Sequence, residues 1–274
     1  MKKIFFLSVL LGLYIFSSGQ ELYVYSEPAS NMPANTISAK VTGMRTSSYT
    51  QDMLRIMPEL MFGFNKNLMV HVTTSFSNMD NNRRLGWESV YLYGKYRFLS
   101  LDDVHKHFRM AAFAQGGYSN GPGHHKEINL MGDRSGVQGG LIVTQLINKF
   151  AASATLSYTR AFKPEELHAG MPYTKEALNY SLSTGLLVLP REYKSYDQLN
   201  VNVYAELLGQ KIPNDPFSYL DLGMAVQFIF KSNTKLNIGR RIALIKRTED
   251  RLMAPGYQIS VEHTFFNALK RKRD

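Results

Sequence analysis

Apolar and polar side chains alternate along LRIMPELMFGFNKNLMVHVTTSF, residues 54–76, on both sides of a polar break at 65–67. Apolar residues occupy most even-numbered positions, whereas the odd-numbered positions hold methionine, histidine and mostly polar residues. A repeat of two predicts β-strands, and a short polar break between two such stretches predicts a hairpin. Each strand therefore has one apolar face, which must meet either a protein core or lipid.

Residues 1–19 have the features of a secretory signal peptide. Lys2 and Lys3 precede an apolar run over 4–16, and small residues follow it up to Gly19. This order of charge, apolar run and small residues is typical of a cleaved signal peptide. The run is too short for a spanning helix, which needs roughly 20 residues. We expect cleavage after Gly19 and export of the remaining chain.

Composition narrows the class of protein further. The chain contains no cysteine, which excludes disulfide bonds and a lipoprotein anchored through cysteine. Its net charge of +10 would suit nucleic acid, but export from the cytoplasm argues against that partner. No later segment offers 18 consecutive apolar residues, so no membrane-spanning helix is expected. A mean hydropathy of −0.23 is compatible with a membrane barrel, because half of its strand residues face a polar lumen.

The alternation continues through twelve stretches, most of them about 11 to 13 residues long. Such lengths exceed the usual five or six residues of a soluble strand. They match the roughly 9 to 11 residues that a tilted strand needs to cross a membrane. The sequence therefore predicts an all-β fold, a single antiparallel transmembrane β-barrel of about 12 strands within 20–266, with a short N-terminal lead and a basic tail at 267–274. The expected strands are 36–46, 53–64, 68–78, 87–99, 107–119, 135–146, 150–161, 177–189, 198–209, 219–230, 234–246 and 256–266.

The connections between these strands alternate in length, as in outer-membrane barrels with short periplasmic turns and long outer loops. An even strand count also puts both chain ends in the periplasm. Aromatic residues near strand ends are expected to mark the two membrane interfaces; they include Phe64, Phe98, Phe150, Tyr158, Tyr219 and Phe230. The turns expected in the periplasm are 65–67, 100–106, that around Asn148, 190–197 and 231–233, and the expected outer loops include 120–134, 162–176, 210–218 and 247–255.

The last strand, GYQISVEHTFF at 256–266, ends in an aromatic pair. It resembles the C-terminal strand by which bacterial outer-membrane proteins are recognised for assembly. The whole exported chain, with segments such as RIMPELMFGFNKNLMVH and KYRFLSLDDVHKHFRMAAF, resembles barrel proteins of Gram-negative bacteria of the Bacteroidetes type whose activity is unknown. This resemblance implies an outer-membrane location and a barrel architecture, and it implies no activity.

Methionine residues gather on the inward parity of the first three strands. Thioether and imidazole groups suit soft ions such as Cu(I) and Ag(I). Methionine also fills irregular interiors well, and the chain has 13 of them, so simple packing is the alternative. Pro58 lies inside the second strand, where we expect a β-bulge. The candidate soft-metal ligands are Met44, Met53, Met57, Met61, Met69 and His71.

Charged residues also occur on the inward parity, because a charge facing lipid at mid-depth costs about 2 to 4 kcal/mol. They could form an ion-pair network that fills a narrow barrel, or line a water-filled pore with a mild anion preference. Arg240 falls on the apolar parity, and we expect a bulge at Gly239 to place it. The expected lumen charges are Lys40, Arg55, Glu59, Lys95, Arg97, Arg109, Glu206, Asp221, Lys235, Arg241 and Glu262.

Three further stretches contain residues that could bind a metal or act in catalysis, but their patterns are less specific. Residues 102–107 and the pair at 124–125 combine histidine with polar residues, and we interpret both as solvated loops. Residues 117–121, GYSNG, partly resemble the segment that holds the nucleophilic serine of the outer-membrane phospholipase. That family has a histidine two positions before the serine, whereas Gly117 precedes Ser119 here, so the activating base is missing. We therefore expect no enzyme activity and no cofactor.

The sequence favours an outer-membrane barrel that acts as a passive channel or transporter for small solutes or ions. Its expected partners are outer-membrane lipid, the outer-membrane assembly machinery and a small solute or ion, and not nucleic acid. Two alternatives remain. One is a closed structural or adhesion barrel that binds a surface partner through its long loops, and the other is a passage for soft copper or silver ions.

Overall fold

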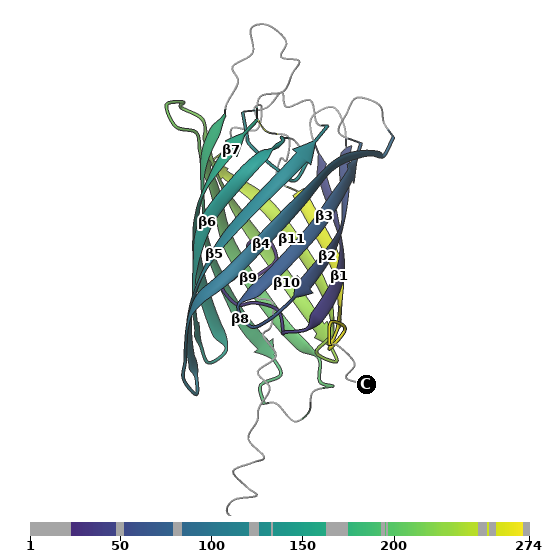
Figure 1. Cartoon of the computed structure of the whole chain (residues 1–274), viewed down its shortest axis with the longest axis vertical. Helices are drawn as coiled ribbons and strands as arrows, with labels where there is room; N and C mark the ends of the chain where they lie inside the picture. The colour runs from purple at the N-terminus through teal and green to yellow at the C-terminus, as the bar shows by residue number, and fades with distance from the viewer. Residues whose placement is uncertain are drawn as a thin grey trace, which may run out of the picture.

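The computed structural model describes residues 23–47, 52–78, 84–120, 126–132, 134–162, 175–192, 195, 197–245, 251 and 256–270. Twelve antiparallel strands form one closed barrel, as the sequence predicted (Figure 1). Within these ranges no helix is long and apolar enough to cross a membrane. The strands are β1 (Thr36–Ser47), β2 (Asp52–Gly63), β3 (Leu68–Ser77), β4 (Gly86–Asp102), β5 (Lys106–Ser119), β6 (Gly136–Ile147), β7 (Phe150–Ala161), β8 (Glu176–Leu189), β9 (Asn200–Lys211), β10 (Ser218–Phe230), β11 (Thr234–Ile245) and β12 (Gly256–Phe265).

Each strand pairs with its neighbours in the sequence, and β1 closes the barrel against β12, with Ile37 opposite Phe265. Closure leaves no unpaired strand edge. The C-terminal end of β12 lies at the lower end of the barrel in Figure 1. We name this end, where 64–67 and 231–233 turn, the short-turn end, and the opposite end the long-loop end.

No strand boundary differs from the expected one by more than three residues. The largest difference is in β4, which continues to Asp102 and leaves a turn of only 103–105. Asp102 pairs with His107 in the ladder, and its carboxylate also meets the His107 ring at 2.7 Å and the Arg109 guanidinium at 2.9 Å. These side-chain contacts extend the hairpin beyond the stretch of clear alternation.

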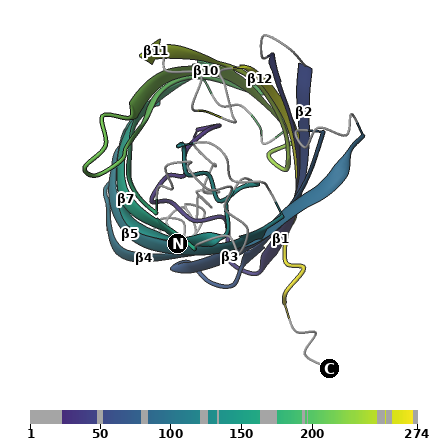
Figure 2. The ribbon, with the colours of Figure 1, turned by 90° about the horizontal axis from the view of Figure 1, so that it is seen from above.

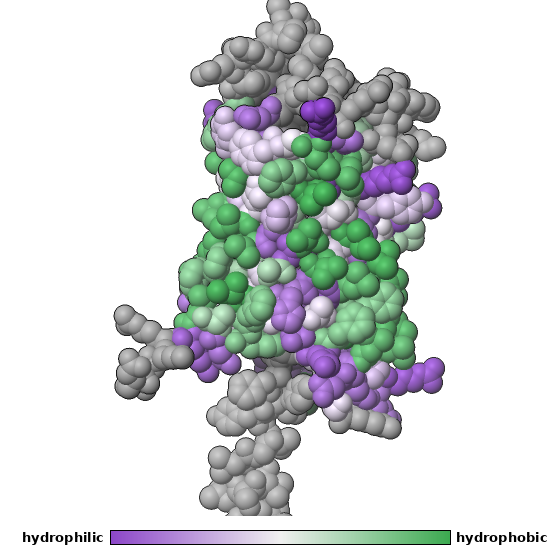
Figure 3. All heavy atoms as spheres, turned by 90° about the vertical axis from the view of Figure 1, so that its right-hand side faces the viewer, coloured by the Kyte–Doolittle hydropathy of each residue, from purple (hydrophilic) through white to green (hydrophobic). Residues whose placement is uncertain are grey.

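Polarity is reversed relative to a soluble protein. Large apolar side chains such as Leu92, Leu156 and Ile259 are exposed on the outer face, while the inner face carries buried serine, threonine, amide and charged side chains. Figure 3 shows apolar side chains over much of the middle of one face, with hydrophilic side chains gathered at both ends. This distribution is that of a barrel built for lipid outside and polar contents inside.

Three details of the sequence prediction were wrong. The expected bulge at Pro58 is absent. The pairing of β1 with β2 is continuous through Pro58. The pairing of β2 with β3 has a gap at Met57 and Pro58, but its register is the same on both sides of the gap. The register is likewise continuous at Gly239; Arg240 points outward from the middle of β11, with its guanidinium 5.2 Å from the Tyr257 ring centre. Tyr219 is buried inside the barrel rather than at an interface.

Candidate functional site

Residues 23–35, which we name the lead, run inside the barrel (Figure 2). The buried carboxylate of Glu206 on β9 accepts the backbone N–H groups of Val24 at 2.8 Å, Tyr25 at 3.0 Å and Ser26 at 2.8 Å. The Ser26 hydroxyl also bonds the Ser183 hydroxyl at 2.8 Å. A buried carboxylate needs such donors to offset its lost hydration. Glu206 therefore holds the lead at mid-barrel.

A second anchor holds the lead nearer the short-turn end. The Lys95 ammonium donates to the carbonyls of Pro28 at 2.6 Å and Ser30 at 2.9 Å, and it pairs with the Glu27 carboxylate at 3.0 Å. The backbone N–H of Ala29 donates to the Thr144 hydroxyl at 2.8 Å. The negative wall residue Glu206 thus binds backbone N–H groups of the lead, and the positive wall residue Lys95 binds backbone carbonyls of the lead.

The wall is also shaped to accept the lead. A side chain at Gly223 or Gly239 would place its Cβ within 2.6 Å of a Tyr25 side-chain atom. Tyr23 packs edge-on against the Tyr204 ring, with ring centres 5.8 Å apart. From its sequence, this segment is predicted only to be a short N-terminal lead, with no place in the barrel. One residue of the sequence could have indicated that a further segment enters the barrel. Glu206 points inward, but its cross-strand neighbours are Ser183 and Gly223, neither of which is basic, so its carboxylate needs a partner from elsewhere.

At the long-loop end, residues 126–132 turn inward. The backbone N–H of Ile128 donates to the Gln210 amide oxygen at 3.0 Å, and the Gln210 amide nitrogen donates to the Ile128 carbonyl at 2.9 Å. The Arg251 guanidinium pairs with Asp221 at 2.7 Å and Glu127 at 3.4 Å. These contacts hold residues 126–132 and Arg251 against the wall.

Between the lead and residues 126–132 lies a chamber of about 330 Å³. Phenol groups of Tyr23, Tyr25 and Tyr93 line it, and their hydroxyls are buried with no hydrogen-bond partner among the described residues. Burial, with a smaller effect of the Glu206 carboxylate, raises the pKa of Tyr23 and Tyr25. Both lead phenols therefore stay protonated and can donate hydrogen bonds into the chamber.

The inward charges expected from the sequence are mostly joined in ion pairs, either with one another or with four residues outside the expected set. These partners are Glu27, Glu88, Asp102 and Arg251. Arg97 is half-buried, and its Nε has no acceptor in the part of the chain that the structure describes. The pairs are Lys40–Glu59 at 3.8 Å, Arg55–Glu88 at 2.6 Å, Lys95–Glu27 at 3.0 Å, Arg109–Asp102 at 2.9 Å, Lys235–Glu262 at 3.0 Å, Arg241–Asp221 at 2.5 Å and Arg251–Asp221 at 2.7 Å.

The structure divides the methionine face into separate groups. Met44, Met57 and His71 line the chamber, and the His71 Nδ1 lies 2.8 Å from the Glu59 carboxylate. Met61 and Met69 line a second, smaller cavity at the short-turn end. Met53 is half-buried near the long-loop end, opposite Thr46 on β1, and lines neither cavity. Within the described ranges, no three histidine, aspartate or glutamate side chains gather as metal ligands.

Ser119 is engaged in a structural contact. Its hydroxyl donates to the carbonyl of Gly132 at 2.5 Å, and its backbone N–H donates to the Ser135 hydroxyl at 2.9 Å. The histidine pair at 124–125 lies outside the described residues, as do the signal peptide at 1–19 and the tail at 271–274. The Ser119 proton is thus directed at a backbone oxygen, which is not the geometry of an activated nucleophile.

No family model and no curated protein sequence matches the chain. An outer-membrane channel from Pseudomonas putida F1 is similar in structure, with a TM-score of 0.52, 11% identity and coverage of 88% of this chain and 99% of that one. The NanC porin is similar at a TM-score of 0.51 and 11% identity, with 83% and 98% covered. Identities this low show the fold alone. The chain therefore has the barrel fold of solved outer-membrane channels.

Proposed function

We propose that the protein is an outer-membrane channel that lets small polar solutes or ions pass by diffusion. The observation that supports it most is the chamber of about 330 Å³, which lies inside a barrel whose outer face is apolar and whose inner face carries buried polar and charged side chains. Pockets that accept small molecules have volumes of about 300 to 1,000 Å³, so the chamber is large enough for one small solute. Export through residues 1–19, insertion by the assembly machinery and periplasmic chain ends belong to the same proposal.

The lead sets the expected conductance. Nearer the short-turn end it lines a small cavity of about 40 Å³ together with wall residues. Small polar solutes should therefore pass slowly while the lead is seated, and larger ones should be excluded. The paired inner charges leave little net charge on the wall, so we expect only a weak preference between small anions and cations.

Planar-bilayer recordings test this function directly. The protein without residues 1–19 should give a small, steady conductance. A variant that also lacks 20–31 should conduct several-fold better, because most of the lead is gone from the lumen. The deletion leaves the barrel itself intact, since β1 begins only at Thr36. Swelling of liposomes in sugars of increasing size would give the size limit of each form. Correct folding should be checked by heat-dependent migration on gels. The absence of conductance from both folded forms would contradict the proposal.

A closed structural or adhesion barrel is the second candidate. The seated lead and the inward turn of 126–132 favour it, because the two segments narrow the lumen from opposite ends. This candidate predicts that removing 20–31 leaves the barrel non-conducting. It also predicts that changes in the outer loops, and not in the lumen, abolish binding to a surface partner.

A further inference from the structure

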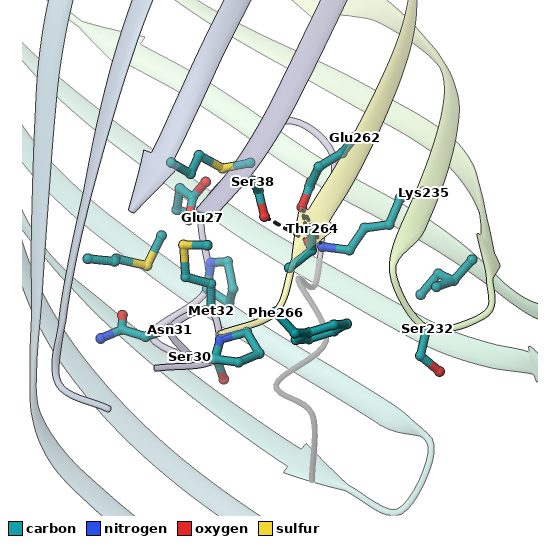
Figure 4. Close-up of a pocket in the computed structure, with 15 residues that line it drawn as sticks. Glu27, Ser30, Asn31, Met32, Ser38, Ser232, Lys235, Glu262, Thr264 and Phe266 are labelled. Carbon is teal, nitrogen blue, oxygen red and sulfur yellow. Dashed lines mark hydrogen bonds and ion pairs between the residues drawn. The ribbon is translucent and has the colours of Figure 1, made fainter. Parts of the chain in front are cut away.

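Three methionines from three separate elements line the small cavity at the short-turn end (Figure 4). Met32 belongs to the lead, Met61 to β2 and Met69 to β3, and the cavity they share has a volume of about 40 Å³. One water needs roughly 10 to 15 Å³ of such space. The cavity that the three methionines help to line is therefore large enough for a bound ion.

The backbone fixes this convergence. Gly63 pairs directly with Met69, and Met61 lies two residues before Gly63 on the same inner face. A Cβ at Gly63 would come within 2.7 Å of the Met32 Cγ, so the missing side chain provides the space in which Met32 lies. Met32 thus packs over Gly63, which is the cross-strand partner of Met69 and lies two residues after Met61.

The environment suits a soft cation. Met61 and Met69 are only 2% and 4% exposed, so bulk water competes little for a bound ion. The charges that line the cavity are joined in pairs, Lys235 with Glu262 and Glu27 with the nearby Lys95, so no net positive charge opposes a monovalent cation. Thioethers bind Cu(I) and Ag(I) and bind hard cations poorly.

An imidazole that lines the neighbouring chamber, and not the small cavity itself, lies beside Met61. His71 is the cross-strand partner of Met61, and its ring is 3% exposed. With the Nδ1 hydrogen donated to Glu59, the His71 Nε2 presents a lone pair, and this atom is buried with no partner in the described part of the chain. A carboxylate bonded to the second ring nitrogen is the usual arrangement of a histidine that binds a metal.

We propose that Met32, Met61 and Met69, with His71 as an additional ligand, bind one soft monovalent cation, Cu(I) or its non-redox analogue Ag(I). Bound there, the ion ties the lead to β2 and β3. The proposal goes beyond the channel function and does not depend on it, because ion binding can be measured whether or not the barrel conducts.

Equilibrium dialysis of the detergent-purified full exported chain against silver nitrate tests the site. The unchanged protein should bind one Ag(I), and the variant M32L/M61L/M69L should lose at least about tenfold in affinity, because leucine keeps the apolar volume but has no sulfur. The matched control is M44L/M57L, which removes two methionines of the separate chamber and should leave affinity unchanged. His71→Phe should weaken binding less than the triple change.

A second measurement keeps the test valid if the triple variant folds poorly. The single change Met32→Leu lies outside every strand, and it should still weaken Ag(I) binding several-fold. Ag(I) should also raise the unfolding temperature of the unchanged protein and not that of Met32→Leu, because a ligand stabilises only the state that binds it. Equal Ag(I) affinity in the unchanged protein and the triple variant would overturn the site, as would an equal loss in M44L/M57L.

Discussion

The Glu206 carboxylate accepts the backbone N–H of Ser26 at 2.8 Å, across a sequence separation of 180 residues. Its other oxygen accepts the N–H groups of Val24 and Tyr25. Hydrogen bonds to a charged group contribute about 1.5 to 3 kcal/mol each. One wall residue therefore makes three of the hydrogen bonds that hold the lead in the lumen.

Replacing Glu206 should release the lead. Glu206→Ala removes all three acceptor contacts, and the lead should become accessible to chymotrypsin at Tyr25, with cleavage identified by mass spectrometry of the folded barrel. Glu206→Gln keeps one acceptor oxygen and should show an intermediate cleavage rate. If the protein is a channel, single-channel conductance should rise in the same order.

The control for this experiment is Glu88→Gln. Glu88 is also a buried carboxylate of the inner wall, but it bonds Arg55 and Ser75 and makes no contact with the lead. Its replacement should leave cleavage at Tyr25 unchanged. Equal protection of Tyr25 in the unchanged protein and in Glu206→Ala would show that Glu206 does not hold the lead.

Loss of the Glu88 carboxylate should instead lower the stability of the barrel. The Arg55 Nε and a terminal nitrogen contact its two oxygens at 2.7 and 2.6 Å, and Arg55 is fully buried. Removing one partner of a buried pair costs about 3 to 5 kcal/mol, because the other charge stays buried. Urea unfolding in lipid vesicles, followed by the fluorescence of the single tryptophan, should show this loss for Glu88→Ala. The double variant R55M/E88A should recover most of the stability; a further loss would contradict the explanation.

A charge on the outer face should be costly only in the middle of the barrel. Leu156 lies in the centre of β7 with 56% of its surface exposed, and Leu101 lies at the short-turn end of β4 with 59% exposed. Leu156→Arg should destabilise the folded barrel in vesicles by about 2 to 4 kcal/mol, and Leu101→Arg by at most about 1 kcal/mol. Equal effects in urea unfolding would mean that the apolar outer face does not lie in lipid as proposed.

The orientation of the barrel can be tested by cysteine labelling, because the chain has no cysteine of its own. A membrane-impermeant maleimide added to intact cells should label His168→Cys in the loop after β7. Lys66→Cys, in the turn between β2 and β3, should react only after the cells are opened. Labelling of position 66 from outside would reverse the proposed orientation.

The strands could be derived from the sequence because their signal is local. Side chains of a strand point alternately to two faces, so a wall between lipid and a polar lumen forces a repeat of two that is visible within one stretch. The stretch at 150–161 coincides with β7 for this reason. The extension of β4 to Asp102 was missed because it depends on side-chain contacts with the next strand rather than on alternation.

The contents of the lumen could not be derived in this way. The lead has no periodic pattern that predicts a position, and it is held by Glu206, Lys95 and Thr144, which lie far away in the sequence. Inward parity predicted that Met61 and Met69 share a wall, because strand register is local to a hairpin. Only closure of the barrel around the lead brings Met32 to them, since that contact requires a segment outside the strands to enter the space above Gly63.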